Sequence, residues 1–324
     1  MKVFITGGAG FIGSHLAERL IGGGHAVVVL DDLSTGAMEN IQGLVDHPAF
    51  EYRIGSVIDA PLVAELVDRC DLTVHLAAAV GVRLIVERPV HTIETNVHGT
   101  EVVLRAVARK QKRVLIASTS EVYGKSVNVP FSEDDDLVLG ATTHARWAYA
   151  CSKALDEWLG LAYHRDKGVP VTVFRLFNTV GPRQTGRYGM VLPSFAGQAV
   201  ENAPITVYGT GEQSRCFCHV KDVVRALEAL MTEDDAIGQV FNIGSDREVT
   251  MNGLAEMVRD EAGSSSEIVH VPYSEAYAEG FEDMMRRMPD LSKLERTIGF
   301  KPSTSLEQIV ADVVAEQRAL LATA

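Results

Sequence analysis

The chain has 324 residues, of which 46% are apolar and 23% charged, as is typical of a globular protein with a full hydrophobic core. Its formal net charge of −13, without a run of Lys and Arg that would override it, argues against binding to nucleic acid or to an acidic membrane. No apolar run reaches the roughly 18 residues of a membrane span, and the N-terminus reads as a strand and not as a signal peptide, so we expect a cytoplasmic enzyme.

Short β-branched runs alternate with helix-length amphipathic segments through the first half of the chain. The predicted strands cover 2–7, 25–31, 51–55, 72–79, 113–118 and 170–178, and the predicted helices cover 11–23, 60–69, 92–110 and 147–167. Strands that alternate with helices of this length form βαβ units with right-handed crossovers. The predicted fold class is therefore α/β, a Rossmann doubly wound parallel sheet.

The first predicted strand runs into the glycine-rich sequence TGGAGFIG, which opens the first helix. In this context Gly7 permits a tight turn, Gly10 lets the backbone approach a pyrophosphate, and Gly13 allows the helix to pack closely on the strand. The helix N-terminus then faces the phosphates. The turn predicts a dinucleotide site.

The second predicted strand ends at Asp31, where a carboxylate can accept hydrogen bonds from both ribose hydroxyls; Asp32 is the alternative for this role. A carboxylate there repels a 2′-phosphate, so the expected cofactor is NAD and not NADP. Asp59 follows the third strand, where the adenine is expected. The remaining expected cofactor contacts are Phe11, Ile12, Ala77, Asn96, Tyr149 and Lys153.

The predicted strand at 113–118 ends in polar residues, Thr119, Ser120 and Glu121, at the edge where a ligand of a parallel sheet binds. Further along, Tyr149 and Lys153 lie one turn apart on one face of a predicted helix. A lysine ammonium stabilises a neighbouring phenolate, so Tyr149 could act as a base near neutral pH. Tyr149 and Lys153 are therefore candidate catalytic residues, and Thr119 and Glu121 are candidates at the neighbouring strand end.

Beyond about residue 178 the pattern changes to Gly- and Pro-rich connections with isolated elements, which suits a smaller lobe over the carboxyl ends of the strands. We predict an NAD-binding Rossmann domain over 1–177, which also takes segments from about 213–245, and a C-terminal α/β substrate-binding lobe over 178–324, interleaved with it.

The four cysteines are too few and too unevenly spaced for a disulfide framework, which agrees with a reducing compartment. Cys216, Cys218 and His219 lack a second pair of ligands elsewhere in the sequence, so they are interpreted as strand residues. We expect no metal site.

With TGGAGFIG, HLAA at 75–78, STSEVYG and YACSK in this order, the chain resembles the extended short-chain dehydrogenase/reductase family, specifically its NAD-dependent nucleotide-sugar epimerases, dehydratases and decarboxylases. The resemblance implies that Thr119 hydrogen-bonds the reacting hydroxyl of the sugar and that Tyr149 takes its proton. Lys153 would hold the nicotinamide ribose and lower the tyrosine pKa, while NAD accepts a hydride from C-4.

The second half resembles the same family in RLFNTVGPR, PITVYGTGEQSR, HVKD and MPD. This implies that the chain binds a nucleotide diphosphate sugar, with Asn178 beside the phosphates and Arg215 and Arg287 on the diphosphate. Val207 and Tyr208 would lie against the base. Ser120 is a further expected substrate contact, and the family also implies a homodimer through the helices at 92–110 and 147–167.

The motifs look most like those of UDP-glucuronate decarboxylases, in which a 4-keto uronate loses CO2 and is reduced to UDP-xylose, with some release of the UDP-4-keto-pentose. Glu121 favours this reading because many 4-epimerases place a small residue there. Residues 77–86, AAAVGVRLIV, are closer to uronate and hexose 4-epimerases, and Arg83 could pair with a substrate carboxylate in either reaction.

Three alternatives therefore stay open. The first is a UDP-sugar 4-epimerase acting on UDP-glucuronate or UDP-glucose, and the second is a nucleotide-sugar 4,6-dehydratase. The third is a catalytically silent NAD-binding regulator. Retention of Thr119, Tyr149 and Lys153 argues against the third, since a silent relative usually loses the tyrosine or the lysine.

Overall fold

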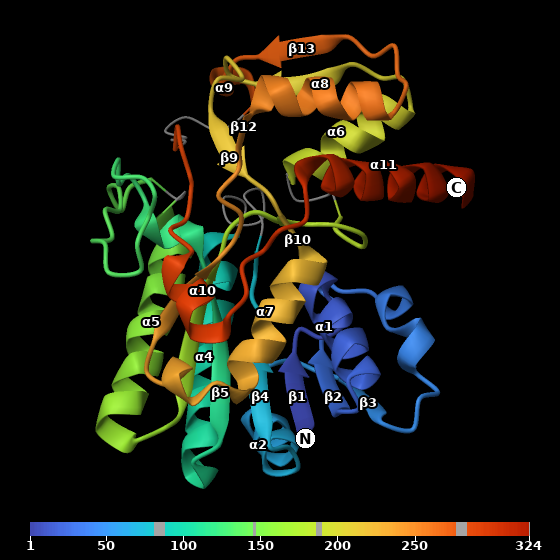
Figure 1. The fold of residues 1–324 in the computed structure, drawn as a ribbon. Helices are drawn as coiled ribbons and strands as arrows, with labels where there is room; N and C mark the ends of the chain where they lie inside the picture. The colour runs from blue at the N-terminus through green and yellow to red at the C-terminus, as the bar shows by residue number, and fades with distance from the viewer. Residues whose placement is uncertain (81–87, 145–146, 186–189, 277–283, 324) are drawn as a thin grey trace.

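A seven-stranded parallel sheet forms the centre of the protein in the computed structural model, which describes residues 1–80, 88–144, 147–185, 190–276 and 284–323 (Figure 1). The strand order is β11-β6-β5-β4-β1-β2-β3. The strands are β1 Lys2–Thr6, β2 Ala26–Asp31, β3 Phe50–Ile54, β4 Leu72–His75, β5 Arg113–Thr119, β6 Val171–Leu176 and β11 Val240–Ile243. This arrangement confirms the predicted doubly wound fold, with its change of direction between β1 and β4.

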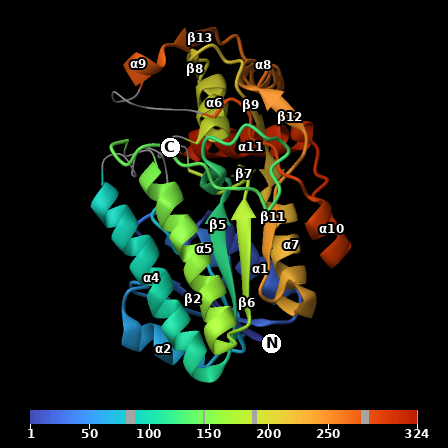
Figure 2. The same ribbon diagram turned by 90° about the vertical axis from the view of Figure 1, so that its left-hand side faces the viewer.

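Helices cover both faces of the sheet (Figures 1 and 2). On one face lie α1 Phe11–Gly22, α7 Val220–Thr232 and α10 Ser292–Ile298; on the other lie α2 Ala60–Asp68, α4 Pro89–Lys110 and α5 Trp147–Lys167. Each face has its own buried apolar cluster, since a parallel sheet is shielded on both sides. The strands are accordingly rich in Val and Ile, as in AVVVLD of β2.

The seventh strand, β11, comes from late in the sequence, yet it pairs in parallel with β6, with Phe241 opposite Phe174. The preceding helix, α7, packs against α1. Residues 220–243 therefore return to the sheet after the chain has left it.

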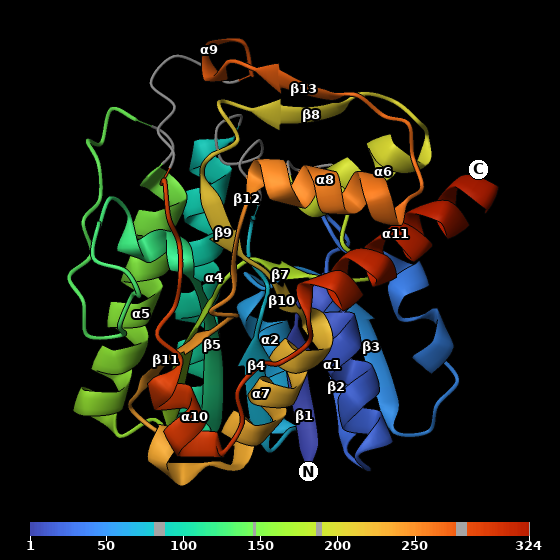
Figure 3. The same cartoon turned by 45° about the horizontal axis from the view of Figure 1, so that its top comes forward.

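A smaller group of elements lies beyond the carboxyl ends of the strands (Figures 1 and 3). Its helices are α6 Val191–Val200, α8 Met251–Glu261, α9 Tyr273–Ala276 and α11 Leu306–Thr323; its strand pairs are β8 Ile205–Tyr208 with β13 Ile268–Val271, β9 Ser214–Cys216 with β12 Glu248–Thr250, and β7 Thr179–Val180 with β10 Cys218–His219. The helices α6, α8 and α11 enclose a separate apolar core.

Short 3-10 turns occur outside this smaller group. They are η1 Met38–Asn40, η2 Gln42–Leu44, η3 Ser120–Tyr123 and η5 Asp234–Ala236.

Candidate active site

The glycine turn between β1 and α1 has no room for side chains at its key positions. Gly7 has φ of +72°, and a Cβ atom there would lie 2.8 Å from the backbone nitrogen of Ala77. A Cβ on Gly13 would lie 2.2 Å from the carbonyl oxygen of Gly7. Gly10 stands at the N-cap of α1, whose first turn leaves backbone N–H groups at the end of the sheet.

Asp31 connects this turn to the end of β2 by a hydrogen bond. Its carboxylate accepts a hydrogen bond of 2.9 Å from the Ala9 N–H and one of 2.8 Å from the Leu33 N–H. Burial raises the pKa of Asp31, while these backbone donors lower it. The alternative residue, Asp32, instead accepts from the backbone and the hydroxyl of Ser34.

Two other residues predicted to contact the cofactor have local structural partners. Asp59 caps α2 by accepting from the Leu62 N–H at 3.1 Å. Asn96 of α4 accepts from the Ala79 N–H at 2.8 Å and donates to the Ser152 hydroxyl at 3.2 Å, so it ties the segment after β4 to α5. Ala77 donates its N–H to Thr6 at the end of β1. Phe11 and Ile12 begin α1 and pack against the core on that face.

The predicted catalytic residues come from two neighbouring elements at the carboxyl edge of the sheet. Thr119 ends β5 and caps η3 by accepting from the Glu121 N–H at 3.2 Å. Tyr149 and Lys153 lie on α5, which packs against η3, and Thr119, Tyr149 and Lys153 are all buried. The Lys153 ammonium lies 2.7 Å from the carboxylate of Asp156, a residue that the sequence analysis did not single out although it stands three positions further along α5.

Glu121 and Arg287 form an ion pair of 2.6 Å, with side chains only 12% and 8% exposed. Arg287 also reaches the Ser120 hydroxyl at 3.5 Å. The Arg287 segment is held in place by backbone hydrogen bonds of 2.8 Å, from the Phe131 N–H to the Met288 carbonyl and from the Asp290 N–H to the Phe131 carbonyl. The guanidinium of Arg287, which was expected to bind a diphosphate, thus pairs with the carboxylate of Glu121, which was expected beside a sugar.

A buried polar network holds η3 in place through the hydroxyl group of Tyr123. Arg175 of β6 pairs with Glu157 of α5 at 2.7 Å, and the Ser118 hydroxyl donates to the same carboxylate. Arg175 also donates to the Tyr123 hydroxyl at 2.8 Å, and that hydroxyl donates to Asn242 of β11 at 2.8 Å. Since β5, β6, α5 and β11 all contribute, the position of η3, which contains Glu121, depends on these four elements.

The residues predicted to bind the nucleotide are spread over the second half. Asn178 donates to the Cys216 carbonyl at 2.9 Å, and Arg215 donates to the Ser214 carbonyl at 2.8 Å. Val207 of β8 is buried, whereas Tyr208 is 42% exposed. Arg83, expected near a substrate carboxylate, lies outside the described residues.

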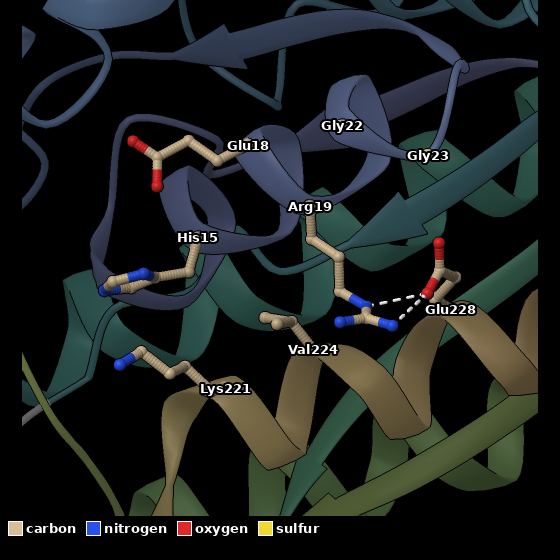
Figure 4. A pocket seen from close by; sticks show the side chains of 8 residues that line it. All are labelled: His15, Glu18, Arg19, Gly22, Gly23, Lys221, Val224 and Glu228. Carbon is tan, nitrogen blue, oxygen red and sulfur yellow. Dashed lines mark hydrogen bonds and ion pairs between the residues drawn. The ribbon is translucent and has the colours of Figure 1, made fainter.

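The hollows among the described residues include one beside sequence neighbours of the predicted site residues and one between α1 and α7. One, of about 580 Å³, is lined by sequence neighbours of Glu121, Tyr149 and Arg287, including Lys125, Trp147 and Arg286. The other, of about 530 Å³, lies between α1 and α7 (Figure 4) and is lined by residues such as His15, Arg19 and Glu228, the last two forming an ion pair. Neither hollow is lined by any of the predicted site residues themselves.

No group of three or more His, Cys, Asp and Glu side chains able to hold a metal ion occurs in the described parts of the chain. Cys216 and Cys218 are both buried, and burial raises the pKa of the Cys216 thiol to about 12. His219 instead interacts with Asp312 of α11 at 3.1 Å.

The fold and this site define a Rossmann-type protein with a Tyr-Lys pair and a Glu-Arg pair at the carboxyl edge of the sheet. Residues 4–313 match the family described as GDP-mannose 4,6 dehydratase. The chain therefore belongs to this family of NAD-dependent epimerases and dehydratases, as its motifs indicated.

Among its relatives, the UDP-N-acetyl-alpha-D-glucosaminuronate decarboxylase of Bacillus cytotoxicus is 42% identical over 97% of this chain and 96% of its own length. UDP-glucuronic acid decarboxylase 1 of Arabidopsis thaliana is 37% identical over 98% of this chain and 70% of its own length. A solved structure of UDP-glucuronic acid 4-epimerase from Bacillus cereus, in complex with UDP-glucuronic acid and NAD, is 27% identical with a TM-score of 0.88, covering 99% of this chain and all of that one.

Proposed function

We propose that this protein is an NAD-dependent decarboxylase of a UDP-uronic acid that converts UDP-glucuronate to UDP-xylose. The observation that carries this proposal is the buried Glu121–Arg287 pair beside Ser120, next to the helix that bears Tyr149 and Lys153. The relatives named as UDP-glucuronic acid decarboxylases support it over nearly the full chain.

The glycine turn fits a dinucleotide. Gly7 and Gly13 have no side chain at positions where a Cβ atom would collide with neighbouring backbone. The first turn of α1 offers N–H donors for phosphates. Asp31, the last residue of β2, would accept hydrogen bonds from the ribose in this proposal. When bound, NAD supplies the acceptor and donor of a hydride at C-4 of the sugar.

Tyr149 takes the proton of the C-4 hydroxyl in this proposal, and Thr119 orients that hydroxyl by hydrogen bonding. Both side chains are buried, so little water competes for the same contacts. Lys153 places a positive charge on the same face of α5, which stabilises the tyrosine phenolate.

Glu121 and Arg287 act at the carboxylate of the uronate. This carboxylate leaves as uncharged CO2, so an unpaired cation beside it would hold it in its charged form and slow its departure. Because Arg287 is already neutralised by Glu121 at 2.6 Å, the pair adds hydrogen-bond donors without a net positive charge. An ordinary 4-epimerase does not need this balance, since its substrate keeps all its carbon atoms.

A second candidate substrate is the C-2 acetamido analogue, UDP-N-acetylglucosaminuronate. It is favoured by the 42% identity with the Bacillus cytotoxicus decarboxylase over the lengths of both chains. The two substrates share the reacting C-4, C-5 and C-6 atoms, so the residue roles above apply to both.

The experiment is incubation of the purified protein with UDP-glucuronate, UDP-N-acetylglucosaminuronate, UDP-glucose, UDP-N-acetylglucosamine and GDP-mannose, followed by mass spectrometry. We expect loss of the mass of CO2 from one of the uronates. Unchanged mass with altered chromatographic retention would instead establish epimerisation, and loss of water would establish dehydration. Tyr149→Phe is the matched inactive control, which should abolish turnover and leave NAD binding intact.

We further propose a homodimer formed through α4 and α5. The two helices pack side by side on one face of the sheet (Figure 2). They expose large apolar side chains, namely Val90, Ile93, Leu155 and Trp158, of which Trp158 is 59% exposed. Apolar side chains of this size on adjacent helices are typical of a surface that another chain covers.

We place the protein in the cytoplasm. All four cysteines are free, and three of them are buried, which fits a compartment where thiols stay reduced. Within the described residues, no helix has the length and apolar character needed to cross a membrane.

A further inference from the structure

Asp156 is a completely buried carboxylate in contact with the lysine of the Tyr-Lys pair. It lies on α5 three positions after Lys153, and its Oδ2 atom is 2.7 Å from the Lys153 Nζ atom. The two side chains are 0% and 3% exposed. Burying a carboxylate costs free energy unless the carboxylate is paired, so Asp156 depends on its contact with Lys153.

The carboxylate is also the end of a chain of buried polar side chains. Burial raises the pKa of Asp156, while the Lys153 ammonium and, to a smaller extent, the Thr100 hydroxyl of α4 counteract that rise. Thr100 is 3.1 Å from Nε2 of His75, and Nδ1 of His75 is 2.8 Å from the Thr6 hydroxyl.

The direction of these hydrogen bonds follows from their ends. Burial lowers the pKa of His75 to about 3, so the imidazole is neutral and carries one N–H. If Thr100 donates to the carboxylate, it accepts from Nε2–H of His75, and Thr6 donates to Nδ1. Thr6 also accepts from the Ala77 N–H. The donors of this chain then point toward Asp156 and offset part of the cost of burying its charge, although its Oδ1 atom has no hydrogen-bond partner among the described residues.

We propose that Asp156 is a positioning residue, which fixes the Lys153 ammonium and balances its charge, so that the Lys153–Asp156 pair sets the alkaline limit of activity. This inference rests on the proposed role of Lys153 beside Tyr149. A second buried carboxylate on the same helix, that of Glu157, pairs with Arg175 of β6 and not with Lys153.

The charged and titratable groups around the pair come from several elements. Tyr149 and Glu157 share α5 with it, and Glu157 raises the pKa of Asp156 by like-charge repulsion. His75 faces it from β4, and Thr100 from α4. Without Asp156, the Lys153 ammonium would be a buried cation with no counter-charge, a state that burial disfavours.

The test compares Asp156→Asn with Glu157→Gln in the full-length protein. Both changes remove a buried carboxylate from α5, so both should lower the unfolding temperature. We expect only Asp156→Asn to move the alkaline limb of the kcat profile to lower pH, by about one pH unit or more. We also expect it to weaken NAD binding at alkaline pH about tenfold, measured by titration calorimetry, since a charged hydrogen bond to the cofactor is lost. Asp156→Glu keeps the negative charge, so the alkaline limb of its kcat profile should lie at the same pH as in the wild type.

Lys153→Met separates this inference from the proposed function. If Lys153→Met is inactive and Asp156→Asn has the pH profile and NAD affinity of Glu157→Gln, Asp156 is a packing residue and the inference is overturned while the proposed site stands. If Lys153→Met retains full turnover, the role of Lys153 fails, and the inference fails with it.

If Asp156→Asn does not fold, the double variant Lys153→Met/Asp156→Asn provides the decisive measurement. It leaves no unpaired buried charge, so it should fold and show the cooperative unfolding transition that Asp156→Asn lacks. Failure of the double variant to fold would show that Asp156 acts on something other than Lys153 and would overturn the inference.

Discussion

Single residues decide which reaction this protein can catalyse, and Glu121 is the residue on which the proposed reaction depends most. Its charge is matched by Arg287, which is 166 positions away along the chain (287 minus 121) and 2.6 Å away in space. Without Arg287, Glu121, which is only 12% exposed, would lose its close counter-charge. Neither residue can therefore be changed without altering the charge that the other presents to a substrate.

Replacing Glu121 with Gln is expected to slow CO2 release more than C-4 oxidation, by about 100-fold in the ratio of the two rates. The reason is that Arg287 would then no longer be neutralised by Glu121 and would hold the substrate carboxylate in its charged form. Stopped-flow absorbance of NADH measures oxidation, and product analysis measures release.

Glu248→Gln is the matched control for this prediction, because Glu248 pairs at 2.6 Å with Arg286, the direct neighbour of Arg287. It should leave the ratio of the two rates unchanged. An equal loss of both rates in Glu121→Gln would reduce Glu121 to a positioning residue.

His75 makes the protein sensitive to acid. Its pKa falls from 6.5 to about 3 on folding because it is buried, so the unfolded chain binds a proton that the folded chain does not. The stability from neutral His75 is full above pH 6.5 and is lost as the pH falls toward about 3. The expected slope is at most about 1.4 kcal/mol of unfolding free energy per pH unit.

His75→Gln should therefore flatten the dependence of unfolding free energy on pH in this window, as measured by urea denaturation. Burial also lowers the pKa of His15 and His219, so part of the slope should remain. His91→Gln, at an exposed position of α4, should leave the wild-type slope. A His75→Gln slope equal to that of wild type would exclude His75 as a source of acid sensitivity.

Among the elements, α1 and the turn before it carry the expected cofactor site. Both ends of this helix contain a glycine, but for different reasons. A Cβ on Gly13 would lie 2.2 Å from the Gly7 carbonyl oxygen, whereas a Cβ on Gly22 would meet nothing within 4 Å. Close packing at one end thus contrasts with open space at the other.

Gly13→Ala is expected to abolish or greatly weaken NAD binding, by at least about tenfold in Kd, because the turn must move away from the phosphates. Gly22→Ala should bind NAD as the wild type does and unfold at the same or a slightly higher temperature, since Ala favours helix over Gly. Calorimetric titration of both variants with NAD tests this, and equal affinities would contradict the predicted cradle.

Local patterns in the sequence predict most of these elements, since the alternation of strands and helices, the glycine turn and the spacing of Tyr149 and Lys153 are all short-range features. The contacts between distant elements could not be predicted in the same way. Nothing in the sequence near Glu121 indicates that Arg287 is its partner. Asp156 is an intermediate case, because its spacing from Lys153 allows a contact on one helix face, but only burial shows that the contact matters.

At the scale of the whole molecule, the proposed dimer is tested by placing a charge on the exposed faces of α4 and α5. Trp158→Glu should convert a dimer to a monomer in analytical ultracentrifugation, because a carboxylate in an apolar interface remains unpaired. Met285→Glu alters a side chain of similar exposure, 63%, away from these helices and should leave the assembly unchanged. A monomeric wild-type protein would exclude the dimer.

The late position of β11 has a consequence for synthesis. Until residue 243 has left the ribosome, β6 is the outer strand of the sheet, with an unpaired edge of Val and Phe residues. The core of α6, α8 and α11 is completed later still, when residues 306–323 arrive. The nascent chain therefore presents an apolar edge from the synthesis of β6 until β11 has emerged, and we expect a chaperone to protect it during that interval.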